Sequence, residues 1–406
     1  MSQGFSRAAV IAIGAGSFTV ALSFGIRSSF GLFLQPMSMD LGSGREMFAL
    51  ALAIQNLATG AAQPFVGMIA DRWGVARTVV AGGLLYALAL YLMATAASAF
   101  ELYVSGGLLV GIALSGTSFG VVLAAVGRAV PAELRSTALG ITTATGSFGQ
   151  FLMPPIGQAL ISSYGWQTTL MFLATTALLM IVAARGLRSG DTAGAHSDDR
   201  QTLSGALREA SHHTGFLYLT AGFFVCGWHV AFIGVHLPAY LADGGISASV
   251  AAWCLALVGL FNVIGSYSAG VLGGRLSKKY CLSVLYGARS LLILVFIVVP
   301  LSVTSALIFS AIMGLLWLST VPLTSGLVAQ IFGPRYMATL FGIVFFSHQV
   351  GAFIGVWLGG YLYDVRGSYD VIWWLSIALG VTAALLHWPI DERAVLRQPD
   401  QLPSRA

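Results

Sequence analysis

Long apolar runs, separated by short polar segments, make up almost the whole chain. Each run has about 20 residues or more, which is long enough for a helix to cross the hydrocarbon core of a bilayer. We predict twelve such helices, at residues 8–35, 47–70, 77–98, 101–127, 136–162, 167–187, 215–241, 249–273, 280–301, 304–330, 337–363 and 371–389. The pattern therefore predicts an all-α membrane protein with twelve transmembrane helices.

The segment 185–214 is the one long polar interruption, and it divides the apolar runs six and six. We interpret residues 1–187 as an N-terminal six-helix bundle, 188–214 as a linker and 215–406 as a C-terminal six-helix bundle with a short tail. Within the linker, the stretch around 202–213 has the pattern of a short amphipathic helix on the inner membrane surface.

The two bundles repeat each other at a constant offset of 202 residues. The repeat holds in the first and in the fifth helix of each half, as in the pairs Gly25–Gly227, Pro36–Pro238, Gly149–Gly351 and Gly165–Gly367. Parallel repeats of this kind predict a pseudo-two-fold axis along the membrane normal. They also predict a binding site between the halves near the midplane, with access alternating as the halves rock.

The basic residues indicate the orientation, because cytoplasmic loops carry an excess of Lys and Arg. With the N-terminus inside, the outer loops hold only Arg45 and Arg366. The inner loops hold Arg72, Arg77, Arg128, Arg135, Arg185, Arg188, Arg200, Arg208, Arg275, Lys278, Lys279 and Arg335. We therefore predict that both termini and the linker are cytoplasmic.

The composition excludes several classes of protein. Charged residues are 9% of the chain, whereas a soluble domain has about 25%. The net charge of +5 is explained by inner loops that face lipid headgroups, so nucleic acid is not expected. We expect no metal, cofactor or enzymatic role: no nucleotide-binding motif or nucleophile–base set occurs, and the cysteines have no metal spacing (Cys226, Cys254 and Cys281). The clustered linker histidines could suggest a metal site, but we interpret them as part of a solvated linker (His196, His212 and His213).

Two arginines interrupt the apolar runs, Arg27 in the first helix and Arg289 in the ninth. A charge at mid-bilayer costs about 2.5–3.5 kcal/mol on insertion scales, and such residues usually face a partner or a watery path. All 15 acidic residues can be placed in loops or at helix ends. The intramembrane field is then net positive, which predicts an anionic ligand.

The loop after the second helix, G-M-I-A-D-R-W-G-V-A-R at 67–77, resembles the signature of the major facilitator superfamily. The matching positions are Gly67, Asp71, Arg72, Gly74 and Arg77. The resemblance implies that this loop sets the balance between conformations by pairing charges with neighbouring helix ends. A degenerate copy at 270–279 keeps Arg275, but Gly274 stands in place of the acid.

The first helix, S-F-G-I-R-S-S-F-G-L-F-L-Q-P, resembles the monocarboxylate transporter family and its bacterial relatives, including the oxalate–formate exchanger branch. Arg27 stands where animal members have a lysine, which implies that it attracts a carboxylate. Those members also carry an aspartate and an arginine in the eighth helix, where this chain has Asn262 and Ser266. The fixed cation is then Arg27 alone or together with Arg289. Alternatively, Arg289 hydrogen-bonds carbonyls of a neighbouring helix.

Three histidines lie within predicted helices: His229, His236 and His348. Histidine is the side chain whose unperturbed pKa lies near neutrality, so it can carry a co-transported proton where no carboxylate is available. His229 is the repeat mate of Arg27. We predict His229 and His348 as proton-coupling and substrate-binding candidates. Asn56 and Asn262 are predicted to orient the substrate, although each could instead only bridge helices.

These patterns predict a secondary transporter that moves a small organic anion together with a proton, and the resemblance implies that the anion is a monocarboxylate. The transporter would act as a monomer in a bacterial inner membrane. The first alternative is an exchanger that swaps organic anions. A proton-driven drug exporter is a weaker alternative, because no buried acid is found and the fourth helix lacks the exporters' arginine. A membrane sensor would need a signalling domain, for which the polar segments are too short.

Overall fold

The computed structural model describes residues 6–190, 202–333 and 336–395, and no strand occurs within these ranges. The first half contains α1 (Arg7–Ser28), η1 (Phe30–Phe33), α2 (Leu34–Asp40), α3 (Arg45–Trp73), α4 (Val75–Ala94), α5 (Ala99–Leu102), η2 (Tyr103–Leu109), α6 (Val110–Thr117), α7 (Phe119–Ala129), α8 (Ala132–Ala183) and η3 (Ala184–Gly190). The second half contains α9 (Leu203–His212), α10 (Thr214–Asp243), α11 (Ala248–Gly273), α12 (Lys278–Val298), α13 (Val303–Leu316), α14 (Thr320–Phe332), α15 (Met337–Arg366) and α16 (Asp370–His387).

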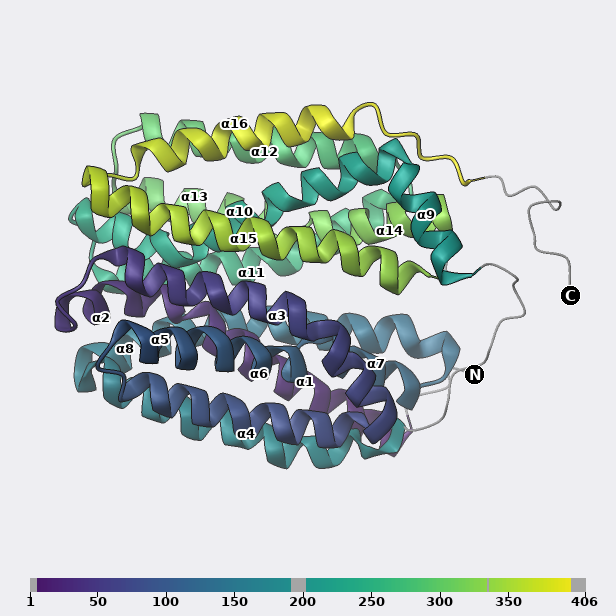
Figure 1. Ribbon diagram of the computed structural model, residues 1–406, viewed down its shortest axis with the longest axis horizontal. Coiled ribbons are helices and arrows are strands. Elements are labelled where there is room, and N and C mark those ends of the chain that lie inside the picture. Colours follow the sequence, from purple (N-terminus) through teal and green to yellow (C-terminus); the bar gives the residue numbers. More distant parts are fainter. Residues whose placement is uncertain (1–5, 191–201, 334–335, 396–406) are drawn as a thin grey trace, which may run out of the picture.

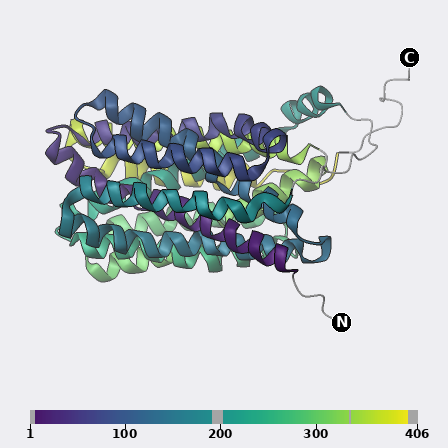
Figure 2. The same ribbon diagram turned by 90° about the horizontal axis from the view of Figure 1, so that it is seen from below.

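The long helices run side by side along the longest axis of the molecule and form two bundles (Figure 1). One bundle contains α1–α8 and the other α10–α16. Figure 2 shows that the start of α1 and the last described residues after α16 lie at the same end, which we call the terminal end; the opposite end is the distal end. The predicted amphipathic helix is present as α9, at the terminal end.

Twelve membrane-spanning segments are present in the described residues. Ten helical stretches are long and apolar enough to cross a membrane, and one of them, Thr137–Leu187, is in fact two spans. It breaks at Gly165, whose φ of 78° is a conformation that favours glycine. Its repeat mate Gly367 also has a positive φ and ends α15. The twelfth span is α3, which is 29 residues long.

Three predicted helices are interrupted. The span predicted at 8–35 becomes irregular after Ser28, where η1 follows α1. The other two interruptions occupy equivalent places in the repeat. The span predicted at 101–127 breaks at Ser118, between α6 and α7. The span predicted at 304–330 breaks between α13 and α14. Pro322 explains this last break, because a proline is tolerated in the first turn of α14 but cannot continue the hydrogen bonding of α13.

Equivalent glycines join the first and fifth spans of each half. A Cβ atom on Gly149 of α8 would clash with the Ala21 carbonyl of α1. A Cβ atom on Gly351 of α15 would clash with the Phe224 carbonyl of α10. Small residues let helix backbones approach closely in membranes, where packing drives association.

The division into residues 1–187, 188–214 and 215–406 stays a prediction, since 191–201 lie outside the described residues.

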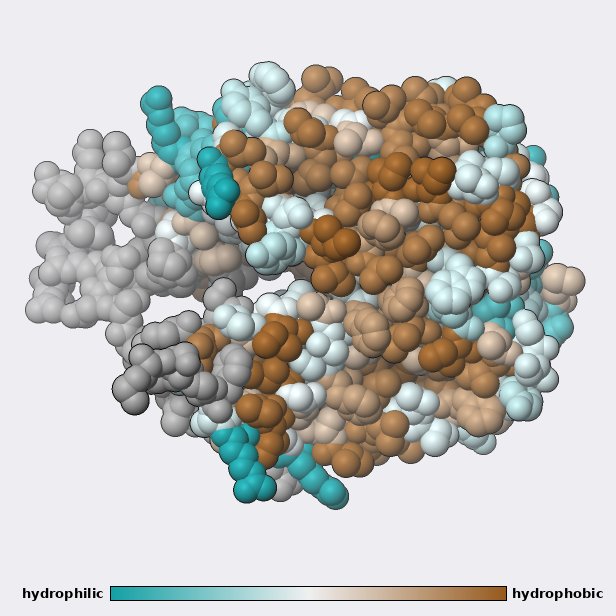
Figure 3. All heavy atoms as spheres, turned by 180° about the vertical axis from the view of Figure 1, so that it is seen from behind, coloured by the Kyte–Doolittle hydropathy of each residue, from teal (hydrophilic) through white to brown (hydrophobic). Residues whose placement is uncertain are grey.

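The two halves meet along a seam that is closed at the distal end. Leu32 of η1 packs with Ala252 and Leu255 of α11 across it. In Figure 3, a gap separates the halves at the terminal end, whereas their side chains touch further along the seam. Hydrophobic residues cover the middle of this face and hydrophilic ones gather toward its two ends, as expected for a protein that spans a bilayer.

Candidate functional site

Arg27 lies in the last turn of α1 and is half-buried. Its guanidinium donates a hydrogen bond to Asn56 Oδ1 of α3, and Tyr86 of α4 lies close enough to interact with it. The helix becomes irregular just beyond it, because Ser28 donates to the Gly25 carbonyl and η1 follows. A cation in this turn also complements the partial negative charge at a helix C-terminus.

Asn56 connects this arginine to the other half. It is 3% exposed, and its Nδ2 donates to the Leu52 carbonyl at 2.8 Å. This bond fixes the amide so that Oδ1 faces Arg27. The Asn56 backbone carbonyl accepts a hydrogen bond of 2.9 Å from Nε2 of Gln349 in α15. The contact therefore crosses the seam between the two halves.

His348 extends the same chain of polar groups. Its Nδ1 donates to Gln349 Oε1 at 3.0 Å, and its ring stacks on Phe345 with 5.6 Å between centroids. The Cys226 thiol of α10 lies beside His348 and accepts or donates a 3.2 Å hydrogen bond with Thr320. We call Arg27, Asn56, Gln349 and His348 the seam network. It brings together three of the six predicted substrate-binding residues.

His229 and Arg289 lie elsewhere, inside the C-terminal half. His229 is 1% exposed, and its Nε2 donates to the Ser376 carbonyl of α16 at 2.8 Å. Arg289 is fully buried and donates to the carbonyls of Leu316 and Trp317, at the break between α13 and α14. Of the two roles that the sequence left open for Arg289, substrate cation or hydrogen-bond donor to backbone carbonyls, the structure shows the hydrogen bonds to carbonyls.

Asn262 of α11 joins three elements. Its Oδ1 accepts hydrogen bonds from the Leu318 backbone N–H at 3.1 Å and from Ser266 at 3.0 Å. Its Nδ2 donates to Ser147 of α8 across the seam at 3.3 Å. Asn262 and Arg289 therefore satisfy opposite kinds of backbone group at the same break, the N–H and the carbonyls.

The signature loop lies at the terminal end, away from the seam network. Asp71 forms an ion pair of 3.6 Å with Arg128 of α7, and the Asp71 side chain is 73% exposed. Gly74 has a φ of 91° and separates α3 from α4, which explains why glycine stands there. The other predicted members are exposed or lie on the α3 surface (Gly67, Arg72, Arg77 and Arg275). Arg200, Arg335 and His196 lie outside the described residues.

Sequence reasoning gave little weight to Gln349 and missed Cys226 and the cluster around Arg45. Gln349 follows a histidine in an apolar helix, and a buried amide of this kind was the available signal. The partners of Cys226 come from other helices, so no local pattern marks it.

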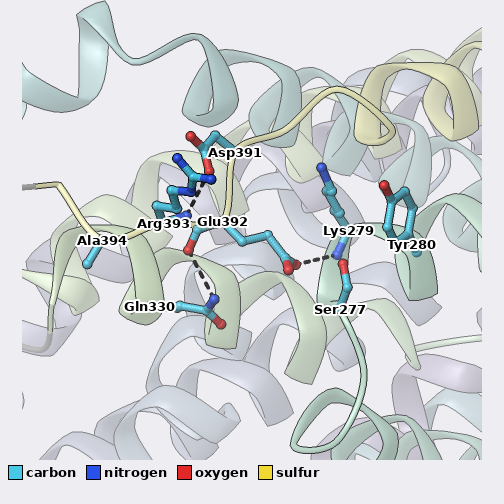
Figure 4. A pocket seen from close by; sticks show the side chains of 8 residues that line it. All are labelled: Ser277, Lys279, Tyr280, Gln330, Asp391, Glu392, Arg393 and Ala394. Atoms are coloured by element: carbon cyan, nitrogen blue, oxygen red, sulfur yellow. Dashed lines mark hydrogen bonds between the residues drawn. The ribbon is translucent and has the colours of Figure 1, made fainter.

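A surface pocket of about 550 Å³ lies at the terminal end (Figure 4). Its lining includes Lys279, Gln330 and Glu392, and the Glu392 carboxylate accepts a 2.7 Å hydrogen bond from the Lys279 backbone N–H. The pocket contains none of the predicted site residues. No group of three or more His, Cys, Asp or Glu residues that could hold a metal occurs in the described part of the chain.

Two repeated helical halves with a polar network across their seam define a multi-pass membrane transporter. The model of the Major Facilitator Superfamily matches residues 16–356 and, again, 219–405. The chain belongs to the Major Facilitator Superfamily. This match confirms the predicted family and its fold. Members of this family are transporters and not enzymes, so the prediction that the protein is not an enzyme is also confirmed.

Known relatives resemble the chain over most of its length. An uncharacterized MFS-type transporter, YcxA, of Bacillus subtilis is 27% identical over 374 residues, covering 89% of this chain and 88% of the relative. Monocarboxylate transporter 12-B of Danio rerio is 25% identical, and the match covers 93% of this chain and 86% of the relative. Monocarboxylate transporter 13 of Rattus norvegicus is 26% identical, with 91% and 87% covered.

Solved structures share the fold at low sequence identity. A bacterial homolog of the human lysosomal transporter Spinster, in an inward-facing and occupied conformation, superposes with a TM-score of 0.74 at 15% identity and covers 95% of this chain and 97% of its own. A D-xylose–proton symporter gives a TM-score of 0.69 at 14% identity, with 94% and 96% covered.

Proposed function

We propose that the protein is a secondary transporter that carries a small organic monocarboxylate together with a proton by alternating access. The observation that carries the proposal is Arg27, a half-buried arginine whose structural partners are the neutral groups of Asn56 and Tyr86. Asn56 in turn bonds to Gln349 of the other half. A cation held by neutral groups keeps its charge for an incoming anion. The similarity to proteins named monocarboxylate transporters supports a carboxylate as that anion.

In this proposal the carboxylate binds the Arg27 guanidinium, and Asn56 holds the guanidinium in place. One uncompensated positive charge matches one carboxylate, so a monoanion fits better than a dianion. We also propose that the terminal end faces the cytoplasm of a bacterial cell, following the distribution of basic loops. The gap at that end of the seam would then open the site inward (Figure 3).

The binding role of Arg27 is tested with purified protein and a panel of small carboxylates, using thermal stabilisation to measure affinity. We expect Arg27→Ala to abolish stabilisation by every carboxylate while the unliganded protein stays folded. Arg27→Lys should keep part of the affinity, because the charge survives and the bidentate fork does not. Arg208→Ala, an exposed arginine of α9, is the matched control. Unchanged affinity in Arg27→Ala would refute the site.

We propose His348 as the residue that takes up the proton, because it belongs to the seam network, with His229 as the other candidate. A proton bound with a monoanion leaves the loaded carrier with the charge of the empty one. Uptake into proteoliposomes should therefore rise as the external pH falls and respond little to membrane potential.

Replacing the proton carrier by glutamine should flatten this pH profile. We expect the flattening in His348→Gln and a wild-type profile in His229→Gln, whose ring is bonded to the Ser376 carbonyl inside one half. The reverse result would assign the proton to His229. If both variants keep the wild-type profile, the proton is carried elsewhere. Uptake that needs an internal counter-anion and no proton would instead establish the exchanger.

A further inference from the structure

The first turn of α3 is held by three elements of the opposite half at the distal end. The Arg45 guanidinium forms a bidentate ion pair with Asp243, the last residue of α10, with N–O distances of 2.5 and 2.7 Å. It also donates to the Tyr369 hydroxyl at 3.1 Å and lies 3.7 Å from the centre of the Tyr363 ring. Arg45 is 8% exposed, so this charge is largely removed from water.

A second contact holds the backbone of the same turn. The helix begins after Gly44, which has no side chain to cap the free N–H groups. The Asp364 carboxylate, from the end of α15, accepts hydrogen bonds from the N–H groups of Arg45 at 2.9 Å and of Glu46 at 2.8 Å. A carboxylate at a helix N-terminus satisfies unpaired donors and the helix dipole. Here the cap comes from the other half of the protein.

Further contacts complete the cluster. Trp357 Nε1 donates to Glu46 Oε1 at 2.9 Å. The Tyr369 hydroxyl donates to His236 Nδ1 at 3.1 Å, and His236 Nε2 donates to the Val356 carbonyl at 2.8 Å. Gly360 lets the two helices approach, because a Cβ atom there would lie 2.8 Å from the Glu46 Cα atom.

We propose that Arg45, Glu46, Asp243, Trp357, Asp364 and Tyr369 form a latch that holds the distal face closed in this conformation. Every bond of the latch to α3 joins the two halves, so opening the distal face breaks all of them together. The latch and the seam network share two helices, α3 and α15. Asn56 lies eleven residues after Arg45 on α3, about 16 Å along the axis, and Gln349 precedes Asp364 on α15.

Two parts of the latch can be weakened by separate substitutions. One part is the ion pair of Arg45 with Asp243, and the other is the cap of Asp364 on the α3 backbone. A contact present in only one state stabilises that state alone. Weakening either part should therefore shift the population toward a distal-open state, and weakening both should shift it further than weakening one.

Labelling of a single introduced cysteine, Leu32→Cys, tests the latch in purified protein. Leu32 is 5% exposed and packs across the seam, so a bulky maleimide reaches a cysteine at this position only when the distal face opens. The chain without this change gives the background from the native cysteines. We expect severalfold faster labelling in Arg45→Gln, Asp243→Asn and Asp364→Asn. Arg45→Gln with Asp243→Asn should be no faster than Arg45→Gln alone, whereas adding Asp364→Asn should make labelling faster.

The charge-reversed pair, Arg45→Asp with Asp243→Arg, should bring the labelling rate back toward that of the parent. Arg366→Gln, an exposed arginine two residues after Asp364, is the control and should leave the rate unchanged. Variants are compared on the monodisperse fraction after size exclusion, so misfolded protein is not counted. Unchanged labelling in the three single variants, or failure of the reversed pair to slow labelling, would overturn the proposal. This readout uses no substrate, so it is independent of the anion proposed above.

Discussion

Arg27 shows how a membrane protein can keep a charge available at the level of a single residue. A buried guanidinium is usually neutralised by a carboxylate, and such a pair leaves no charge for a ligand. Here the bonded partner is the Asn56 amide oxygen, which orients the guanidinium and adds no negative charge. Gln349 connects His348 to the same chain of hydrogen bonds, because its amide oxygen accepts a bond from the His348 ring.

Asn56→Asp tests this reasoning with almost no change of shape. The new carboxylate lies where Oδ1 accepts the Arg27 bond, and it would pair with the guanidinium and compete with the substrate. We expect carboxylate affinity to fall at least about tenfold, equivalent to roughly 1.4 kcal/mol. Thermal stabilisation by the same carboxylate panel measures the loss. Asn56→Ser, which brings no charge, should lose less; equal losses in both variants would show that charge is not the cause.

At the level of the element, broken helices place polar backbone groups inside the membrane. The gap between α13 and α14 leaves carbonyls and an N–H without helical partners, and each such group is expensive in an apolar medium. Arg289 bonds the carbonyls of Leu316 and Trp317, and Asn262 bonds the N–H of Leu318. Both residues therefore stabilise an interruption that the apolar pattern does not reveal.

Arg289→Met should consequently lower the stability of the whole protein. Losing the donor leaves buried carbonyls unpaired, at a cost of about 1–3 kcal/mol for each group. We expect a clear fall in melting temperature, partly restored in Arg289→Lys, while the remaining folded protein binds carboxylates with unchanged affinity. Differential scanning fluorimetry with and without carboxylate separates the two effects. Lost affinity at unchanged stability would instead make Arg289 a substrate ligand.

At the level of the whole molecule, the two ends of the seam differ. The distal end is joined by cross-half bonds, whereas the halves are separated at the terminal end (Figure 3). The signature loop lies at the separated end, and its Asp71 pairs with Arg128 of its own half. An exposed pair of this kind contributes at most about 1 kcal/mol. We therefore expect Asp71 to act mainly in the other conformation.

Asp71→Asn should slow transport while changing neither the melting temperature measurably nor the ranking of substrates. The matched variant is Arg128→Gln, which removes the same ion pair. If Asp71 acts in the other conformation, Asp71→Asn should slow uptake more than Arg128→Gln does. Initial uptake rates in proteoliposomes, with competition by a carboxylate panel, measure both quantities. A changed substrate ranking would contradict this division of roles.

The apolar pattern alone was sufficient to predict the spans and their number, and matching residues at a constant offset predicted the internal repeat. A chain that crosses a bilayer must pair its backbone N–H and C=O groups internally, and a helix does so within one segment. The thickness of the hydrocarbon core sets the length of that helix. The glycine pairs of the repeat also correspond to equivalent helix contacts, since Gly149 and Gly351 each pack against the first helix of their own half. Arg27, Asn56 and His348 were identifiable because polar residues in apolar helices are few.

Only the tertiary structure decided which of these residues meet. Arg27 and Gln349 lie on different halves of the chain, and the facing directions of their helices depend on packing across the seam. His229 is the repeat mate of Arg27, yet it bonds to the Ser376 carbonyl of α16 inside its own half, so equivalent positions in the repeat have different partners. The helix breaks and the Arg45 cluster depend in the same way on partners remote in sequence, which no local periodicity encodes.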